Sequence, residues 1–424
     1  MTEELLNFLW KNKLYTTDSL ILADGLNIEV IHPGEYNRDE GPDFFNTRIK
    51  IDETIWAGNA EVHVKASDWI KHGHSGNGSY NNVILHIVAE NDIAIERADG
   101  NAIPAIVLKC NETILAQYQY LLQNRLWVPC AKQLPSVNSF TKSLWLEKLG
   151  IERLEEKSKD IVQHLNQTQN DWEETFYRIL ARSFGFHLNG QAFEQLAQSL
   201  PHKVLVKHAD SLIQTEALIF GQAGFLNGII PYDDYFNKLQ KEYNFLAKKY
   251  KLKSLSVHLW KFLRLRPGNF PTIRLAEFSS LIHKHPNLFS TIRDSVSLSN
   301  LFELFNIKTS EYWNNHYMFG KVSKAKEKVL GHDSAEILFI NAIIPALFMY
   351  GKSYGLAHIQ DKALDLLNQL PAEKNSIIEN WNKLGIVTHN AFHSQALLQL
   401  KYGYCDKHKC LDCAIGNKIL MELV

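Results

Sequence analysis

The chain has 424 residues, of which 45% are hydrophobic and 21% are charged, and its formal net charge is −1 at pH 7. This length exceeds what one compact core usually holds, so we expect two or three domains, and the composition excludes a fibrous or largely disordered chain. The near-zero charge excludes a whole-molecule attraction to nucleic acid or anionic membranes, so any such binding requires a local basic patch.

The first residues, MTEELLNFLWKN, predict a short amphipathic helix. Acidic residues stand where a secretory signal needs a basic segment, and an odd count of five cysteines fits a disulfide framework poorly. We therefore expect a cytoplasmic protein. The longest apolar stretch, residues 337–350, is short for a bilayer span and contains Pro345, so it predicts a buried core helix and no membrane partner.

Short β-branched runs separated by Gly, Asn and Asp turns follow in the first third of the chain. These runs are residues 47–51, 54–66, 82–90 and 102–108. They predict a mostly antiparallel sheet within a mixed α/β domain of residues 1–135.

From about residue 140 the apolar spacing becomes helical. Residues 143–168 predict one long helix, and residues 171–186 predict another that begins at the N-cap Asp171 and ends near a glycine. The expected fold class is therefore α+β: the sheet domain, a larger all-α domain of residues 136–395, and a Cys-rich metal-binding tail of residues 396–424 packed on the rest.

The tail has the spacing C-x4-C-x2-C, formed by Cys405, Cys410 and Cys413. Thiolates are soft ligands, so this spacing predicts a structural site for zinc or an iron–sulfur cluster. The fourth ligand has three candidates: His408, Cys130, or a histidine of residues 389–393. An iron–sulfur cluster favours four cysteines, which would require Cys130 or Cys110. The alternative is that the three tail cysteines are reduced and bind nothing.

The segment 37–69 is rich in acids and bases. A hairpin turn near Glu53 would place Asp43 opposite His63, and the two-residue period puts Glu61, His63 and Lys65 on one strand face. Two carboxylates there could hold magnesium, and the lysine or histidine could orient or deprotonate a water for attack on a phosphodiester.

Two other interpretations of this segment stay open. One is a solvated strand face whose charges only keep an edge soluble. The other is a different metal site formed by His63, His72 and His74 in a β-barrel, although the glycine-rich sequence HGHSGNGS around the last two histidines is more typical of a flexible loop.

A second basic region surrounds the sequence RPGNFP. Its arginines are Arg264, Arg266 and Arg274, with Trp260 and Phe270 close by, and they are candidate nucleic-acid contacts. The alternative is a rigid elbow between helices in which the arginines pair with acids.

Two family resemblances follow from these motifs. Pro42-Asp43, followed by Glu61-Val62-His63 on the next strand, resembles the PD-(D/E)xK nuclease superfamily, with histidine where that pattern has lysine. The segments GPDF, GNAEVHVKASDW, RPGNFPTIRLA and YC-x4-C-x2-CAIG together resemble a bacterial domain-of-unknown-function family (2851), which implies no activity.

The nuclease resemblance implies a nucleic-acid-processing or nucleic-acid-binding protein with a magnesium-dependent phosphodiesterase site. In that function Asp43 and Glu61 hold the cation, and His63 or Lys65 acts on the water. The alternative function is a non-catalytic scaffold or adaptor whose helical half binds a protein or RNA partner.

Overall fold

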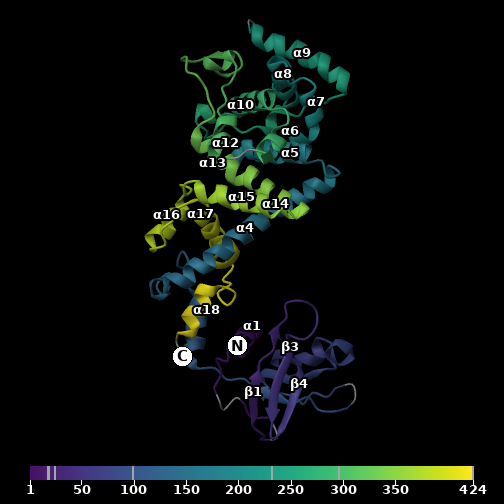
Figure 1. Cartoon of the computed structure of the whole chain (residues 1–424), viewed down its shortest axis with the longest axis vertical. Helices are drawn as coiled ribbons and strands as arrows, with labels where there is room; N and C mark the ends of the chain where they lie inside the picture. The colour runs from purple at the N-terminus through teal and green to yellow at the C-terminus, as the bar shows by residue number, and fades with distance from the viewer. Residues whose placement is uncertain (17–19, 23–24, 98–99, 231–232, 295–296, 423–424) are drawn as a thin grey trace. The chain divides into compact units, whose positions relative to one another are not determined.

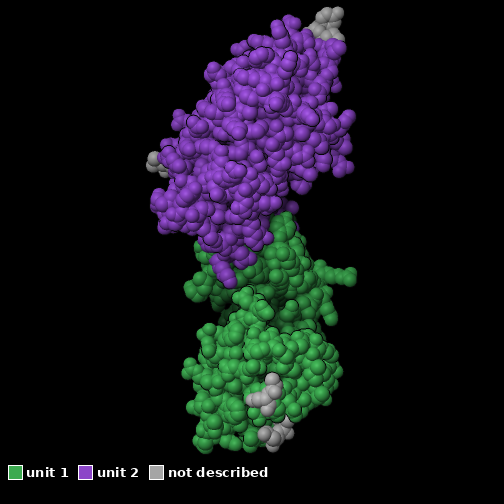
Figure 2. Space-filling model, turned by 90° about the vertical axis from the view of Figure 1, so that its right-hand side faces the viewer, with its two compact units in different colours: residues 1–147, 383–386, 398–424 green, residues 148–382, 387–397 purple. Residues whose placement is uncertain are grey.

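The computed structural model describes residues 1–16, 20–22, 25–97, 100–230, 233–294 and 297–422, and the chain forms two compact units (Figures 1 and 2). Unit 1 contains residues 1–147, 383–386 and 398–424. Unit 2 contains residues 148–382 and 387–397. The C-terminal tail thus belongs to the same compact unit as the N-terminal sheet.

A six-stranded sheet forms the centre of unit 1 (Figure 1). Its strands are β1 (Ile28–His32), β2 (Glu35–Tyr36), β3 (Phe44–Ile51), β4 (Thr54–Lys65), β5 (Val83–Glu90) and β6 (Ala105–Val107). The main order is β1-β3-β4-β5-β6, and β2 pairs with β3. Strands β1 to β4 pair antiparallel, whereas β4–β5 and β5–β6 are parallel. The predicted α+β class is confirmed, but the prediction of a mostly antiparallel sheet is wrong because the sheet is mixed.

The parallel pairing of β4 with β5 follows from the long connection between them. Parallel neighbours need a crossover of a dozen or more residues, and residues 66–82 provide one. This crossover contains α2 (Asp68–Lys71) and two 3-10 turns (His74–Gly76 and Gly78–Tyr80). Strand β5 is accordingly buried on both faces from Val83 to Val88, as its continuous apolar sequence requires.

The register of the β3–β4 hairpin differs from the predicted one. A two-residue turn pairs Ile51 with Thr54, and a bulge then shifts the pairing so that Phe44 lies opposite Ala60. Asn46, inside this bulge, has a positive φ of 57°. Asp43 therefore lies beside Glu61 and not opposite His63, because the turn shifts the pairing by one residue from the predicted register and the bulge in β3 shifts it by one more.

Helices at both ends of the chain complete unit 1. They are α1 (Glu3–Lys11), α3 (Glu112–Gln123), the 3-10 turn Leu134–Ser136, the π-helical turn Leu400–Cys405 and α18 (Ala414–Met421). Helix α1 buries Leu5, Leu6, Leu9 and Trp10 and contacts β4 and β5. Helix α4 (Ser139–Gln167) begins in unit 1 and continues into unit 2.

Unit 2 is helical, with one small hairpin of β7 (His316–Met318) and β8 (Lys321–Val322). Its remaining helices, wholly or mostly within the unit, are α5 (Trp172–Phe184), α6 (Phe186–Ser199), α7 (His202–Val206), α8 (Leu212–Gln222), α9 (Asp234–Tyr250), α10 (Pro271–Lys284), α11 (Leu288–Asp294), α12 (Leu298–Leu304), α13 (His332–Leu338), α14 (Ile344–Tyr354), α15 (Ala357–Gln369), α16 (Ser376–Lys383) and α17 (Ala391–Gln399). This is the larger helical domain that the sequence predicts.

The apolar stretch around Pro345 lies in a continuous helical run, His332–Tyr354, with a π-helical turn at Phe339–Ile343. By length and composition this run could cross a membrane, but 67% of its apolar window is buried within the protein. Phe339, Ile343 and Leu347 belong to the hydrophobic core of unit 2.

Candidate metal centres

One face of the sheet carries buried polar side chains at the centre of unit 1. Glu61 and His63 lie two residues apart on β4 and therefore point to the same face, and β5 places His86 beside Glu61 in the parallel register. Glu61 is 5% exposed, His63 1% and His86 0%. Burial of three such groups on adjacent central strands costs free energy unless each has a polar partner or a bound ion.

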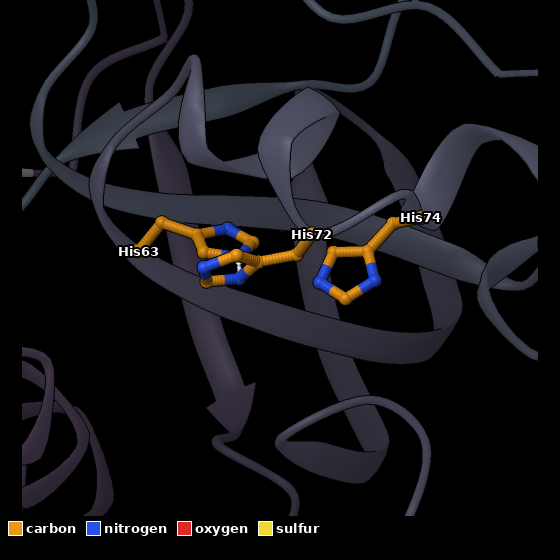
Figure 3. A group of neighbouring side chains, drawn as sticks. All are labelled: His63, His72 and His74. Atoms are coloured by element: carbon orange, nitrogen blue, oxygen red, sulfur yellow. Dashed lines mark hydrogen bonds between the residues drawn. The ribbon is translucent and has the colours of Figure 1, made fainter.

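His72 and His74, from the β4–β5 crossover, meet His63 (Figure 3). His72 ends α2, and Gly73, with a φ of 74°, turns the chain so that His74 begins the next turn. One ring nitrogen from each of the three histidines lies within 4.8 Å of the others, and His63 Nε2 is 3.1 Å from His72 Nδ1. The expectation that these two histidines lie in a loose loop is therefore wrong.

Glu61 adds a carboxylate oxygen to the three imidazoles. Its Oε1 lies 3.2 Å from His74 Nε2 and 3.8 Å from His63 Nε2. His74 Nε2 is buried and makes no hydrogen bond within the described part of the chain. The His74 ring stacks on Tyr80 with 3.8 Å between centroids, so its position is fixed by packing.

Two hydrogen bonds from backbone N–H groups hold the carboxylates of Asp43 and Glu61 in place. The Asp43 N–H donates to Glu61 Oε2 at 3.0 Å, and the Val62 N–H donates to Asp43 Oδ2 at 3.1 Å. The Pro-Asp carboxylate and the Glu carboxylate thus come together as the sequence predicts. Sequence reasoning did not find Glu3, in the first turn of α1, whose carboxylate acts electrostatically on both.

Lys65 lies apart from this group. Its ammonium is exposed and pairs with Glu90 at 2.9 Å. The predicted meeting of Lys65 with Asp43 and Glu61 is therefore wrong, because Lys65 lies beyond the buried part of β4, at the exposed end of the strand.

Burial is the main cause of the pKa shifts in this cluster. Burial and the neighbouring Asp43 raise the pKa of Glu61 to about 9, and burial raises the pKa of Asp43 to about 7. Burial and the neighbouring histidines lower the pKa of His63 to about 3, and burial and His72 lower the pKa of His74 to about 4. The lowered pKa values keep the imidazoles neutral, which is the form that binds a metal ion. The positive charge of a divalent cation would also favour the ionised form of the two carboxylates.

The spacing of the donor atoms fits a single transition-metal ion. Metal–nitrogen bonds of about 2.0–2.1 Å place the ligands of a tetrahedral site about 3.4 Å apart, and those of an octahedral site somewhat closer. The separations among His63, His72, His74 and Glu61 bracket that value. In the described residues a second set with donor atoms this close is His332, Asp333 and Glu336, of which the first two are exposed.

All five cysteines belong to unit 1, and four of them form a group. The thiols of Cys405, Cys410 and Cys413 interact electrostatically with one another, and Cys130 interacts with all three. Burial, followed by the neighbouring thiols, raises the pKa of Cys130 to about 12. His408 directs Nδ1 to the Leu121 carbonyl at 3.2 Å, and His389 and His393 are residues of unit 2.

The three predicted arginine contacts differ in exposure. Arg264 and Arg266 are exposed. Arg274 is 7% exposed, and its guanidinium bonds Glu277 at 2.8 Å and Asn269 at 2.7 Å and lies over the Phe186 ring. The prediction that Arg274 contacts nucleic acid is therefore wrong, because α10 buries it in the helical core.

A mixed sheet followed by a helical unit, with a buried histidine–carboxylate cluster, defines a two-unit α+β protein with a candidate metal centre. Residues 3–376 match the model of the family described as "Protein of unknown function (DUF2851)", and the chain belongs to that family. No curated protein and no solved structure matches the chain.

Proposed function

We propose that this protein is a metal-dependent hydrolase of phosphodiesters, and that nucleic acid is its substrate. The observation that carries the proposal is the convergence of three imidazole nitrogens within 4.8 Å, with Glu61 Oε1 3.2 Å from the buried, unbonded His74 Nε2. The Pro-Asp and Glu carboxylates, brought together on adjacent strands, support phosphodiesters as the substrate class.

The donor set favours a transition metal over magnesium. Magnesium prefers oxygen ligands, whereas imidazole suits zinc, copper, iron and nickel. In the proposed site His63, His72 and His74 bind the ion, and Glu61 supplies an oxygen ligand. His72 is exposed, so substrate and water reach the ion from that side.

The proposed reaction is hydrolysis of a phosphodiester by water. A bound ion would supply Lewis acidity and so lower the pKa of a water at the site. Asp43, whose Oδ2 is held by the Val62 N–H, would accept the proton of that water as its oxygen bonds to phosphorus and the bond to the leaving oxygen breaks, and a proton from solvent would complete the alcohol. Arg264 and Arg266 are proposed as phosphate contacts of unit 2.

The test uses metal-depleted full-length protein, reloaded separately with Mn²⁺, Zn²⁺, Fe²⁺ or Mg²⁺. Hydrolysis of bis(p-nitrophenyl) phosphate and of single- and double-stranded DNA and RNA is measured. We expect activity with a transition metal and a loss of at least about 100-fold in Glu61→Gln and in His74→Ala.

The matched control is Lys65→Ala on the same strand, which should keep full activity because Lys65 pairs with Glu90 away from the cluster. Hydrolysis that is unchanged in Glu61→Gln, or absent with every metal and substrate, contradicts the catalytic proposal.

A second candidate function is a non-catalytic scaffold or adaptor that binds a protein or RNA partner. It is favoured by the Lys65–Glu90 pair, which holds the predicted catalytic lysine away from the two carboxylates. Stoichiometric metal binding that is lost in His74→Ala, without hydrolysis by the wild-type protein, would support this function.

A further inference from the structure

The four-cysteine cluster lies within unit 1 and uses two distant parts of the chain. Cys130 lies in the turns between α3 and α4, while Cys405 ends a π-helical turn and Cys413 is the N-cap of α18. Cys130, Cys410 and Cys413 are 7–9% exposed, and Cys405 is half-buried. The fifth cysteine, Cys110, shows no electrostatic coupling to them.

The backbone around the three tail cysteines is tightly folded. His408 adopts a positive φ of 52°, and its carbonyl accepts from the Cys410 N–H at 2.9 Å. A Cβ at Gly416 would lie 2.2 Å from the Cys410 carbonyl oxygen. Only glycine allows α18 to approach Cys410 so closely, and this approach brings Cys413 to the other thiols.

Two backbone hydrogen-bond donors lie at the Cys413 sulfur. They are the N–H groups of Ile415 and Gly416, in the first turn of α18. Such donors stabilise negative charge on a metal-bound sulfur, and the N-terminus of α18 adds a favourable dipole.

The separation of the sulfurs discriminates between metals. A zinc ion with bonds of about 2.3 Å holds four sulfurs about 3.8 Å apart. Within the described residues, the triads whose donor atoms all lie within 4.8 Å contain histidines and carboxylates but no cysteine. Any three of the four sulfurs therefore include a pair more than 4.8 Å apart, which is wider than a zinc site allows and fits one sulfur on each iron of a four-iron cluster.

We infer that Cys130, Cys405, Cys410 and Cys413 bind a [4Fe–4S] cluster that joins the C-terminal tail to the segment after α3 within unit 1. Cys405 also lines a cavity of about 730 Å³ together with Trp127, Lys401 and His408. Oxygen can reach this corner of the cluster, so the cluster is sensitive to air.

The experiment purifies the full-length protein without oxygen and measures iron, acid-labile sulfide, zinc and the visible absorption of sulfide-to-iron charge transfer. We expect about four irons and four sulfides per chain, with loss of both on exposure to air. Sulfide distinguishes this cluster from an iron ion at the histidine centre, which contains none, and His74→Ala should leave the sulfide content unchanged.

Variants test the ligand assignment. Cys130→Ser and Cys405→Ser should each lose most of the sulfide, whereas Cys110→Ser should retain it. Cys405 is the less buried of the two, so its variant remains informative if Cys130→Ser does not fold. Zinc that remains in His74→Ala and is lost in Cys405→Ser, a metal-free folded protein, or full sulfide content in both ligand variants would overturn the inference.

Discussion

His86 supports the histidine centre without belonging to it. Its Nε2 lies 2.9 Å from His63 Nδ1, so a His63 that binds a metal through Nε2 would donate its Nδ1 proton to His86. Second partners of this kind fix the ring orientation and raise the basicity of the metal ligand. The sequence alone does not reveal this role of His86, because its partner His63 comes from another strand.

His86→Leu should therefore weaken metal binding about 10- to 100-fold without removing a ligand. His86→Gln, which can still accept from His63, should retain most of the affinity. Competition with a coloured chelator measures both, and His258→Leu, at an exposed histidine of unit 2, is the control. Equal affinity in the Leu variant and the wild-type protein would show that His86 does not position His63.

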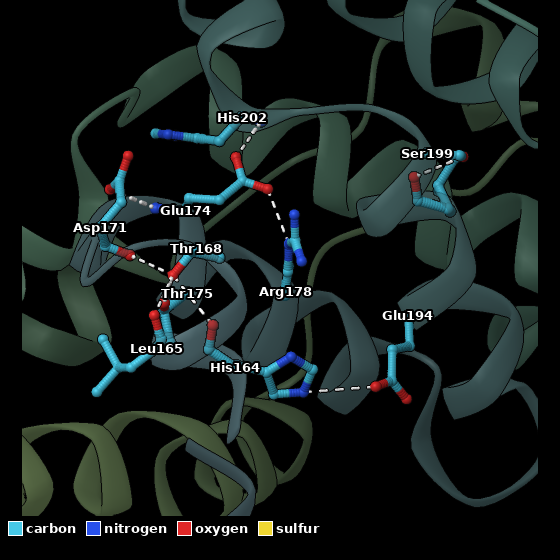
Figure 4. Close-up of polar contacts among 11 residues, drawn as sticks. His164, Leu165, Thr168, Asp171, Glu174, Thr175, Arg178, Glu194, Ser199 and His202 are labelled. Carbon is cyan, nitrogen blue, oxygen red and sulfur yellow. Dashed lines mark hydrogen bonds and ion pairs between the residues drawn. The ribbon is translucent and has the colours of Figure 1, made fainter. Parts of the chain in front are cut away.

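At the scale of an element, helix α5 is fixed by its first residues. Asp171, the N-cap that the sequence predicts, accepts from the Glu174 N–H at 3.0 Å (Figure 4). Glu174 in turn accepts from the His202 N–H at 2.8 Å and pairs with Arg178. The start of α5 is thereby tied to the start of α7.

Asp171→Ala should lower the free energy of unfolding by about 1 kcal/mol, because it leaves an N–H of the first turn without a partner. Asp171→Asn should remain within a few tenths of a kcal/mol of the wild-type protein. Chemical denaturation measures the difference. The exposed Asp160→Ala on α4 is the control, and an equal loss there would show that the cap is not the cause.

At the scale of the whole molecule, both candidate metal centres lie in unit 1, which the chain leaves at Glu147 and to which residues 398–424 return. Unit 2 instead depends on a large apolar core with a few buried charged groups. Glu216 on α8 is one of them: it is 0% exposed and accepts from the hydroxyls of Tyr235 and Ser310. Burial raises its pKa to about 7, although these hydrogen bonds oppose the shift.

The stability of unit 2 should therefore depend on pH through Glu216. Its pKa in the folded protein lies above the ordinary 4.5, so the folded state binds more protons between these values. The contribution is fully present below pH 4.5 and is lost as the pH rises through 7, by on the order of 3 kcal/mol.

The measurement is the free energy of unfolding from pH 4.5 to 8. Glu216→Gln should flatten the decline, whereas the exposed Glu303→Gln should not. A decline of the same slope in Glu216→Gln would rule out Glu216 as its source.

The sequence by itself determined features that depend on neighbouring residues. Local periodicity located strands β3 to β5 and helix α5 with its cap Asp171. It also located the change from strands in the first third of the chain to helices in the rest. The continuous apolar run of β5 and the long 66–82 connection also contained the signal for a parallel strand, although alternation in the other strands favoured an antiparallel sheet.

Only the tertiary structure decided which distant side chains meet. The exact turn and the extra residue of the β3 bulge together set Asp43 beside Glu61, and the crossover brought His72 and His74 to His63. The same folding carried Cys130 to the tail cysteines and buried Arg274 against Glu277. These outcomes depend on strand register and on the path of the chain through space, which arise from packing between segments and leave no periodic trace in either segment alone.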